Sequence, residues 1–316
     1  MNAERKIVNG EFVRSVSSFR NWITVDGSAG PTGEGGFKAE ANRYHLYVSY
    51  ACPWAHRTLI FRALKGLEDI ITVSVVHPLL ESTGWKFADY PGSTVDHVNG
   101  FNYMYEAYAA SHAHFDGVVT VPVLWDKKRQ TIVNNESSEI IRMLNTAFNE
   151  LTDNTVDYYP SELRDEIDQV NDLVYQNVNN GVYRSGFATT QEAYERAYDR
   201  LFDTLDDLEN RLSKQRYLVG DQITEADWRL FTTLVRFDAV YHGHFKTNKK
   251  RLVDYPSLWA YTRELYQIPG IAETTNMDHI KYHYYASHKT INPKGIVPKG
   301  PEIDFMLPHG RETIKA

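Results

Sequence analysis

A strand, a helix and a second strand follow one another between residues 45 and 76, and this order constrains the fold more than any other feature. His45-Leu-Tyr-Val-Ser49 predicts a short strand, and the residues from Cys52 onward turn into a helix that runs to about Lys65. Ile70-Ile-Thr-Val-Ser-Val-Val76 is dense in β-branched residues, as is typical of a buried strand flanked by helices. The three elements predict a parallel β-α-β unit.

The pattern continues with a helical stretch around 99–111, a hairpin and a further helix. Two short strands at 121–125 and 130–133 flank a charged turn. Apolar residues at helical spacing follow a helix start near Ser137. The order β-α-β-α-β-β-α predicts a thioredoxin-like fold. From about 160 to 280 the apolar residues repeat only at helical spacing, which predicts an all-helical second domain.

The chain divides into four predicted segments. Residues 1–42, with a Gly-rich stretch from Gly27 to Gly36, predict an extended arm that wraps the first domain. Residues 43–150 are the thioredoxin-like domain, and residues 160–286 are the helical domain. Residues 287–316 are rich in proline and glycine, so we expect an extended tail on the surface.

Composition excludes several classes of function. The net charge is −7 and no long Lys/Arg run is present, so the sequence does not predict a basic surface for binding nucleic acid or an anionic membrane. No window reaches the ~18 apolar residues of a membrane span, and the N-terminus has no apolar leader, so we expect a cytoplasmic protein. A single cysteine among 316 residues excludes an internal disulfide and a thiolate metal cluster.

Cys52 lies between a strand and a helix, with Pro53 in the first helical turn, where a missing N–H is tolerated. The free amides and the dipole at a helix N-terminus favour a negative charge, so we expect this thiol to have a lowered pKa and to be a nucleophile. A buried, inert cysteine is the alternative. His56, four residues on, is either a catalytic base or a packing and hydrogen-bonding residue.

Two further motifs suit a peptide ligand. In thioredoxin-like folds a proline placed like Pro122 is commonly cis, which turns the backbone N–H and C=O of Val121 toward such a ligand; an ordinary trans proline is the alternative. Glu136 and Ser137 stand at a helix N-terminus and offer a carboxylate for an amine, and amides and a hydroxyl for a carboxylate. The γ-glutamyl end of glutathione carries both groups.

Motifs along roughly residues 1–305 closely resemble the glutathionyl-hydroquinone reductases, the Xi class of glutathione transferases. Cys-Pro-Trp-Ala alone would also suit omega-class transferases, but the N-terminal arm and the segment 291–301 look like the Xi class. The resemblance implies a thioredoxin-like domain followed by the helical C-terminal domain of a glutathione transferase. It rests on Tyr50-Ala-Cys-Pro-Trp-Ala-His-Arg57, Gly84-Trp85-x-Phe87, Thr120-Val-Pro-Val-Leu-Trp-Asp126, Asn135-Glu-Ser-x-Glu-Ile-Ile-Arg-Met143, Asn180-Gly-Val-Tyr183 and His279-Ile-Lys-x-His-Tyr284.

The resemblance also implies roles for single residues. Cys52 would be the nucleophile, and glutathione would be held by Trp85, Val121, Glu136 and Ser137. Tyr183 and Tyr284 would line an aromatic-substrate pocket and hydrogen-bond the hydroquinone oxygens, although in a chain with 21 tyrosines both also suit a plain aromatic core. Three positions depart from the family pattern: Val118 and Tyr282 replace basic residues, and Thr247 stands where a second cysteine is common.

The implied reaction removes glutathione from a glutathionyl-hydroquinone through a Cys52–glutathione mixed disulfide. A second glutathione then releases oxidised glutathione, so we expect glutathione as co-substrate and neither a metal nor a nucleotide. The expected partners are glutathione, glutathionylated quinones and a second copy of the chain in a homodimer. An omega-like thioltransferase or dehydroascorbate reductase is the alternative, because it would use the same cysteine on other substrates.

Overall fold

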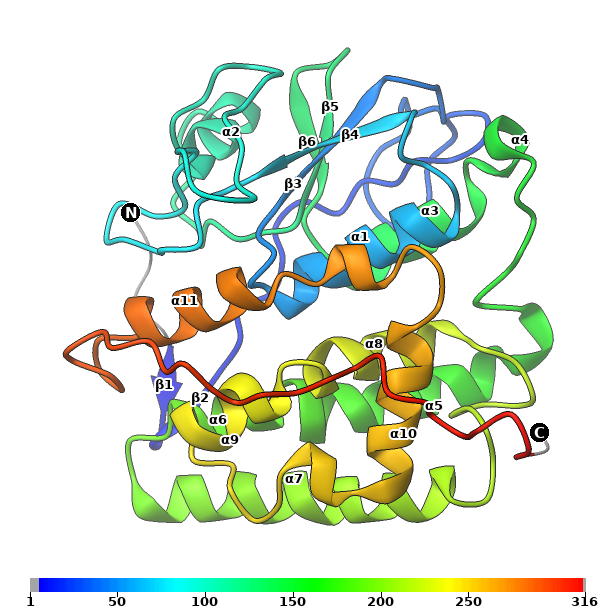
Figure 1. The fold of residues 1–316 in the computed structure, drawn as a ribbon. Helices are drawn as coiled ribbons and strands as arrows, with labels where there is room; N and C mark the ends of the chain where they lie inside the picture. Colours follow the sequence, from blue (N-terminus) through cyan, green and yellow to red (C-terminus); the bar gives the residue numbers. More distant parts are fainter. Residues whose placement is uncertain (1–5, 315–316) are drawn as a thin grey trace. The chain divides into compact units, whose positions relative to one another are not determined.

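The computed structural model describes residues 6–314, which form two compact units (Figure 1). Unit 1 consists of Ser15–Asp157 and Glu273–His283. Unit 2 consists of 6–14, Tyr158–Ala272 and 284–314. The two units are therefore not continuous in sequence. Residues 6–14 belong to unit 2, and the short stretch Glu273–His283 near the C-terminus belongs to unit 1.

Unit 1 is built on a four-stranded mixed sheet in the order β4-β3-β5-β6. The β3 strand (Tyr44–Val48) pairs in parallel with β4 (Ile71–Val75) and antiparallel with β5 (Val123–Asp126), which pairs with β6 (Thr131–Asn134). The helices α1 (Pro53–Leu64) and α3 (Ser137–Thr146) pack against each other below the sheet in the view of Figure 1, and α2 (Met104–Ser111) packs on β6. This topology confirms the thioredoxin-like prediction.

The central strand β3 is buried along its whole length, which explains its apolar character. Its one imidazole, His45, is 1% exposed and contacts two hydroxyls of β4, Thr72 Oγ1 at 2.7 Å and Ser74 Oγ at 2.9 Å. Burial lowers the pKa of His45 to about 4, which keeps the ring neutral inside the sheet.

Unit 2 is helical, as its sequence periodicity predicts, apart from the hairpin of β1 (Ile7–Val8) and β2 (Glu11–Phe12). Leu201, Leu205 and Leu208 of its long helix are all buried at the spacing of one helix face. The helices of unit 2 are α5 (Arg164–Val174), α6 (Gly181–Gly186), α7 (Gln191–Leu212), α8 (Glu225–Leu234), α9 (His242–His244) and α10 (Pro256–Tyr266), with π-helical η2 (Tyr175–Asn179) and η3 (Phe237–Tyr241).

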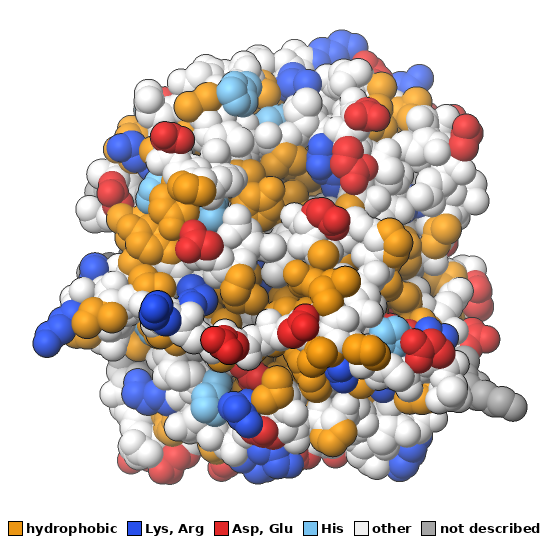
Figure 2. All heavy atoms as spheres, in the orientation of Figure 1, with side chains coloured by type: hydrophobic (Ala, Val, Ile, Leu, Met, Phe, Trp, Pro, Cys, Tyr) orange, Lys and Arg blue, Asp and Glu red, His pale blue; other side chains and the backbone are white. Residues whose placement is uncertain are grey.

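The remaining helical elements complete the described chain. These are α4 (Asn149–Thr152), η1 (Ser161–Leu163), η4 (Leu252–Asp254), η5 (Ala272–Thr274) and α11 (Met277–Ser287). None of the helices between residues 6 and 314 has the length and apolar character that crossing a membrane requires. On the face drawn in Figure 2, acidic and basic side chains alternate without a continuous field of either sign.

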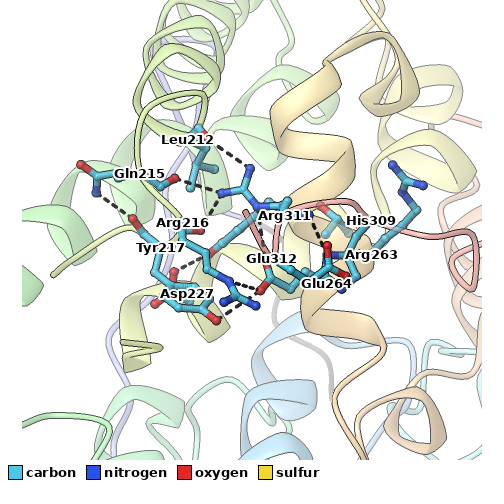
Figure 3. A network of polar contacts seen from close by, with 12 residues as sticks. Leu212, Gln215, Arg216, Tyr217, Asp227, Arg263, Glu264, His309, Arg311 and Glu312 are labelled. Atoms are coloured by element: carbon cyan, nitrogen blue, oxygen red, sulfur yellow. Dashed lines mark hydrogen bonds and ion pairs between the residues drawn. The ribbon is translucent and has the colours of Figure 1, made fainter. Parts of the chain in front are cut away.

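The C-terminal tail differs from the expectation of a segment lying on the surface. Residues 288–314 contain no helix or strand, but the Phe305 ring stacks on Tyr266 with centroids 4.9 Å apart, and Arg311 is 2% exposed. Figure 3 shows the Arg311 guanidinium at the end of α7, where it donates to the Leu212 carbonyl at 3.0 Å and to the Glu264 carboxylate at 3.1 Å. The last carbonyls of a helix have no intrahelical partner, and here the buried Arg311 side chain satisfies the carbonyl of Leu212.

Candidate active site

Cys52 occupies the N-cap position of α1, directly before Pro53. Its backbone is extended, with φ −76° and ψ 120°, and its carbonyl accepts the first helical hydrogen bond from His56 N–H at 2.9 Å. The side chain is half-buried, and Sγ lies 3.4 Å from the carbonyl oxygen of Val121. The thiol therefore lies at the N-terminus of α1, beside the loop that precedes β5, as the sequence predicts.

Two neighbours act on this thiol in opposite directions. The positive end of the α1 dipole favours the thiolate, because amides at a helix N-terminus stabilise negative charge. The Val121 carbonyl is an acceptor and favours the protonated S–H.

His56 is completely buried in the first turn of α1. Its Nε2 lies 2.8 Å from Thr274 Oγ1 and 3.5 Å from Thr275 Oγ1, so the ring links α1 to the end of η5 and the residue that follows it. This engagement favours the packing and hydrogen-bonding role over that of a catalytic base.

The Val121–Pro122 peptide bond is cis, as expected from the thioredoxin-like context. The residue before it, Thr120, is held by Tyr108, whose hydroxyl donates to the Thr120 carbonyl at 2.9 Å and accepts from the Thr120 N–H at 3.2 Å. Asn135 Nδ2 in turn donates to the Tyr108 hydroxyl at 3.1 Å. The backbone beside Cys52 is thus anchored to the start of α3 through a buried polar network.

Glu136 is the N-cap residue of α3. Its carboxylate accepts hydrogen bonds from the Ser138 N–H at 3.1 Å, the Ser138 hydroxyl at 2.8 Å and the Ser17 hydroxyl at 2.9 Å. Burial raises the pKa of Glu136, but these hydrogen bonds and the charge of Arg57 outweigh it, so its net pKa is lowered. Glu136 is therefore an anion at neutral pH and suits an ammonium group.

Ser137 begins α3 and is 3% exposed. Its hydroxyl accepts a hydrogen bond from Arg57 Nη1 at 3.3 Å, which joins α1 to the first turn of α3. The N-termini of two helices and one buried guanidinium therefore favour an anionic ligand here, next to the Glu136 carboxylate.

Trp85 is 7% exposed, and its ring stacks on His283 with centroids 5.0 Å apart and an interplanar angle of 22°. His283 is held by a contact of 2.9 Å between Nδ1 and the Pro78 carbonyl. Tyr282, one of the three positions that depart from the family pattern, precedes His283 in the chain. Its ring stacks on Tyr90 with centroids 5.3 Å apart. Trp85 thus belongs to an aromatic and histidine layer of unit 1.

Tyr183 and Tyr284, which the sequence singles out, meet in unit 2. Their hydroxyl oxygens are 2.5 Å apart, and the Tyr284 hydroxyl is also 3.0 Å from that of Tyr241. Tyr183 is half-buried, whereas Tyr284 and Tyr241 are almost completely buried. Three phenol hydroxyls from α6, α11 and η3 therefore form one cluster.

The sequence reasoning missed Tyr241 because Phe237-Asp-Ala-Val-Tyr241 has no feature that separates it from an ordinary helical stretch. In the structure this stretch is π-helical, and a second π-helical stretch precedes α6, the helix of Tyr183. π-helical turns are frequent at functional sites. Burial raises the pKa of Tyr241 and Tyr284 well above the usual range, and Arg236 opposes this only partly, so both phenols stay protonated and can donate.

Among residues 6–314, no group of three or more His, Cys, Asp or Glu side chains is arranged to hold a metal ion. In unit 1 the thiol and the helix N-termini suit thiol chemistry on a peptide-like ligand. In unit 2 the phenol cluster suits hydrogen bonding to the polar groups of an aromatic ring. A thioredoxin-like unit with these features, together with a helical unit, is the architecture of a glutathione transferase.

Comparison with known proteins supports this class. The family model for the N-terminal domain of glutathione S-transferase matches residues 51–147, and the model for the C-terminal domain matches residues 191–264. A curated relative, glutathionyl-hydroquinone reductase YqjG of Escherichia coli, is 57% identical over 311 residues, which are 98% of this chain and 95% of the relative.

Two solved structures extend the comparison. The glutathione-bound structure of YqjG has a TM-score of 0.93 at 58% identity and covers 94% of this chain and 96% of that one. The glutathione S-transferase Xi of Phanerochaete chrysosporium has a TM-score of 0.89 at 54% identity, with 95% of each chain covered. The chain belongs to the glutathione S-transferase family, and within it to the Xi class of glutathionyl-hydroquinone reductases.

Proposed function

We propose that this chain is a glutathione-dependent reductase that removes glutathione from glutathionyl-hydroquinones. The observation that carries the proposal is the position of Cys52, at the N-cap of α1 with Sγ 3.4 Å from the carbonyl that precedes a cis proline. Unit 1 thus offers a thiol nucleophile beside a stretch of backbone, just before β5, that suits a peptide. The match along nearly the whole chain to a glutathionyl-hydroquinone reductase supports the substrate class.

Glutathione is the co-substrate, and we assign its contacts to Trp85, Val121, Glu136 and Ser137. The Val121 backbone suits the cysteinyl amide of the tripeptide. The Glu136 carboxylate suits its γ-glutamyl ammonium group, and the Ser137 end of α3 suits its γ-glutamyl carboxylate. Trp85 offers a rigid apolar wall. Val118 departs from the expected family pattern because it has no basic side chain, so we assign the carboxylate contacts to the helix N-termini and the Arg57 guanidinium.

In the first step the Cys52 thiolate attacks the glutathione sulfur of the substrate. An S–S bond forms, the bond between that sulfur and the ring carbon breaks, and its electron pair passes to the ring. The ring carbon takes up a proton, so the ring is reduced to the hydroquinone while the sulfur is oxidised to a Cys52–glutathione disulfide. We assign hydrogen bonding of the ring oxygens to Tyr183 and Tyr284.

In the second step the thiolate of another glutathione attacks the mixed disulfide. Oxidised glutathione leaves, and the Cys52 thiolate is restored. The proton that this glutathione loses balances the proton taken up by the ring, so hydroquinone and oxidised glutathione are the only products. We further propose that the protein works in the cytoplasm as a homodimer.

The chain offers a direct test because Cys52 is its single thiol. Excess glutathionyl-hydroquinone without free glutathione should leave one glutathionyl group covalently bound per chain, measured by intact-mass spectrometry. Added glutathione should discharge the adduct as oxidised glutathione, and Cys52→Ser should form no adduct. Repeated turnover without added thiol would contradict the mechanism. A faster reaction with protein mixed disulfides or dehydroascorbate than with any glutathionyl-hydroquinone would favour the omega-like alternative instead.

A further inference from the structure

The N-terminal hairpin of β1 and β2 is attached to α6 and the start of α7. The Thr189 N–H donates to the Gly10 carbonyl at 3.0 Å, and Glu11 forms an ion pair of 3.3 Å with Arg184. The Phe12 ring contacts the Tyr183 ring, with centroids 6.2 Å apart. Residues 6–14, which the sequence assigns to an arm that wraps the first domain, thus belong to unit 2 and pack against the helix that carries Tyr183.

Arg14 follows this hairpin and reaches Tyr183 from the face of its ring. Its guanidinium carbon lies 4.9 Å from the centroid of the Tyr183 ring, within the range of a cation–π interaction. Its Nε donates to Asn180 Oδ1 at 2.7 Å, and Asn180 is the N-cap residue of α6. Besides its ring contacts, the phenol is therefore held by Tyr284 at its hydroxyl and by Arg14 over its ring.

A fixed cation at this distance also affects the energy of negative charge near the phenol. When negative charge develops on or beside the Tyr183 oxygen, the guanidinium stabilises it through a half-buried environment that screens the charge less than bulk water does. Charge of this kind arises when the carbon–sulfur bond of a glutathionyl-hydroquinone breaks, because the electron pair enters a ring whose oxygens accept hydrogen bonds.

We infer that Arg14 is a positioning residue for the reductase reaction, which orients Tyr183 and stabilises the negative charge shared between its hydroxyl and the ring oxygen of the substrate. The inference rests on the proposed function and concerns its first step only. No bond forms or breaks at Arg14, and the proton balance of the reaction is unchanged. The second step, attack of glutathione on the mixed disulfide, involves no ring and should not depend on this cation.

Arg184 offers a matched control on the same helix. It is adjacent to Tyr183 in sequence, half-buried, and joined to the hairpin through Glu11. Arg184→Met therefore removes a cation and one attachment of the hairpin, as Arg14→Met does, but it removes no cation from the face of the Tyr183 ring. Arg14→Lys keeps the charge and serves as a second test variant if Arg14→Met does not fold.

The experiment measures the two steps separately in the wild-type chain and in these variants. Rapid quenching followed by intact-mass spectrometry gives the rate of adduct formation, and the preformed adduct mixed with glutathione gives the rate of its discharge. We expect Arg14→Met to slow adduct formation about tenfold, the size expected for a partly desolvated cation–π contact, and to leave discharge unchanged. The rate of adduct formation in Arg14→Lys should lie between those of Arg14→Met and the wild type. Arg184→Met should match the wild type in both steps.

The substrate series adds a result that a purely structural role would not produce. Electron-withdrawing chlorine substituents stabilise the developing ring charge, so the slowing by Arg14→Met should shrink as chlorines are added to the hydroquinone. Equal slowing for every ring, equal slowing of both steps, or a wild-type rate in Arg14→Met would overturn the inference while leaving the proposed function intact. Absence of any adduct in the wild-type chain would instead overturn the proposed function.

Discussion

Arg311→Met is the substitution whose effect on stability can be worked out most directly from the structure. The guanidinium is 2% exposed and donates to the carbonyls of Leu212, Gln215 and Arg216 at 3.0, 3.0 and 2.6 Å (Figure 3). It also forms an ion pair with Glu264 at 3.1 Å. Methionine keeps most of the apolar stem but provides no donor, so the substitution isolates the polar contribution.

The expected loss follows from the groups left behind. A buried acceptor that loses its partner costs about 1–3 kcal/mol, and breaking a buried ion pair costs roughly 3–5 kcal/mol. The Glu264 carboxylate keeps Arg216 at 2.6 Å and Tyr217 at 3.2 Å, which reduces its share of the loss. Because these contributions are not additive, we expect the free energy of unfolding to fall by about 3 kcal/mol.

Urea unfolding followed by circular dichroism and tryptophan fluorescence measures this difference. With an m-value of roughly 3 kcal/mol/M, the midpoint should fall by about 1 M. Arg263→Met is the matched control, because Arg263 is half-buried and its donation to the tail goes to the Pro308 carbonyl at 2.6 Å. It should cost less than about 1 kcal/mol. If Arg311→Met cost no more than this control, the tail would be a surface segment after all.

The remaining predictions concern the sheet and the site. Alkylation of Cys52 by iodoacetamide should have its midpoint below pH ~8.5, the ordinary value of a free thiol, and a midpoint at or above it would remove the argument from the α1 dipole. Glu136→Gln should weaken glutathione binding about tenfold by calorimetry, whereas unchanged affinity would place the ammonium group elsewhere. Tyr284→Phe should lower kcat/KM for the quinone adduct with glutathione affinity preserved, and a parallel loss of affinity would contradict its assignment. For His45, whose pKa of about 4 lies below that of the unfolded chain, the unfolded state binds the proton first. Stability should therefore fall by about 3 kcal/mol as the pH drops from 6.5 to 4, and a His45→Gln variant with the same pH dependence would refute this.

Much of unit 1 was predictable because its signals are local. A strand followed by Cys52-Pro53 and a helix, and a buried run of β-branched residues, specify elements through neighbours in sequence. The position of the thiol at a helix N-terminus follows from the same local pattern. The helix start at Ser137 also follows from a local pattern, whereas the cis bond at Pro122 was expected because the thioredoxin-like fold favours it.

What lies around the tyrosines and the tail was decided by tertiary structure. Arg14 meets Asn180 across 166 positions, and Tyr241 meets Tyr284 across 43. Arg311 reaches the end of α7 across 99. Periodicity tells which face of an element is buried, but it does not tell which distant element covers that face or which polar group meets which partner. Those pairings are selected only when the packed units bring the groups within hydrogen-bond distance, where an unpaired buried donor or acceptor is costly.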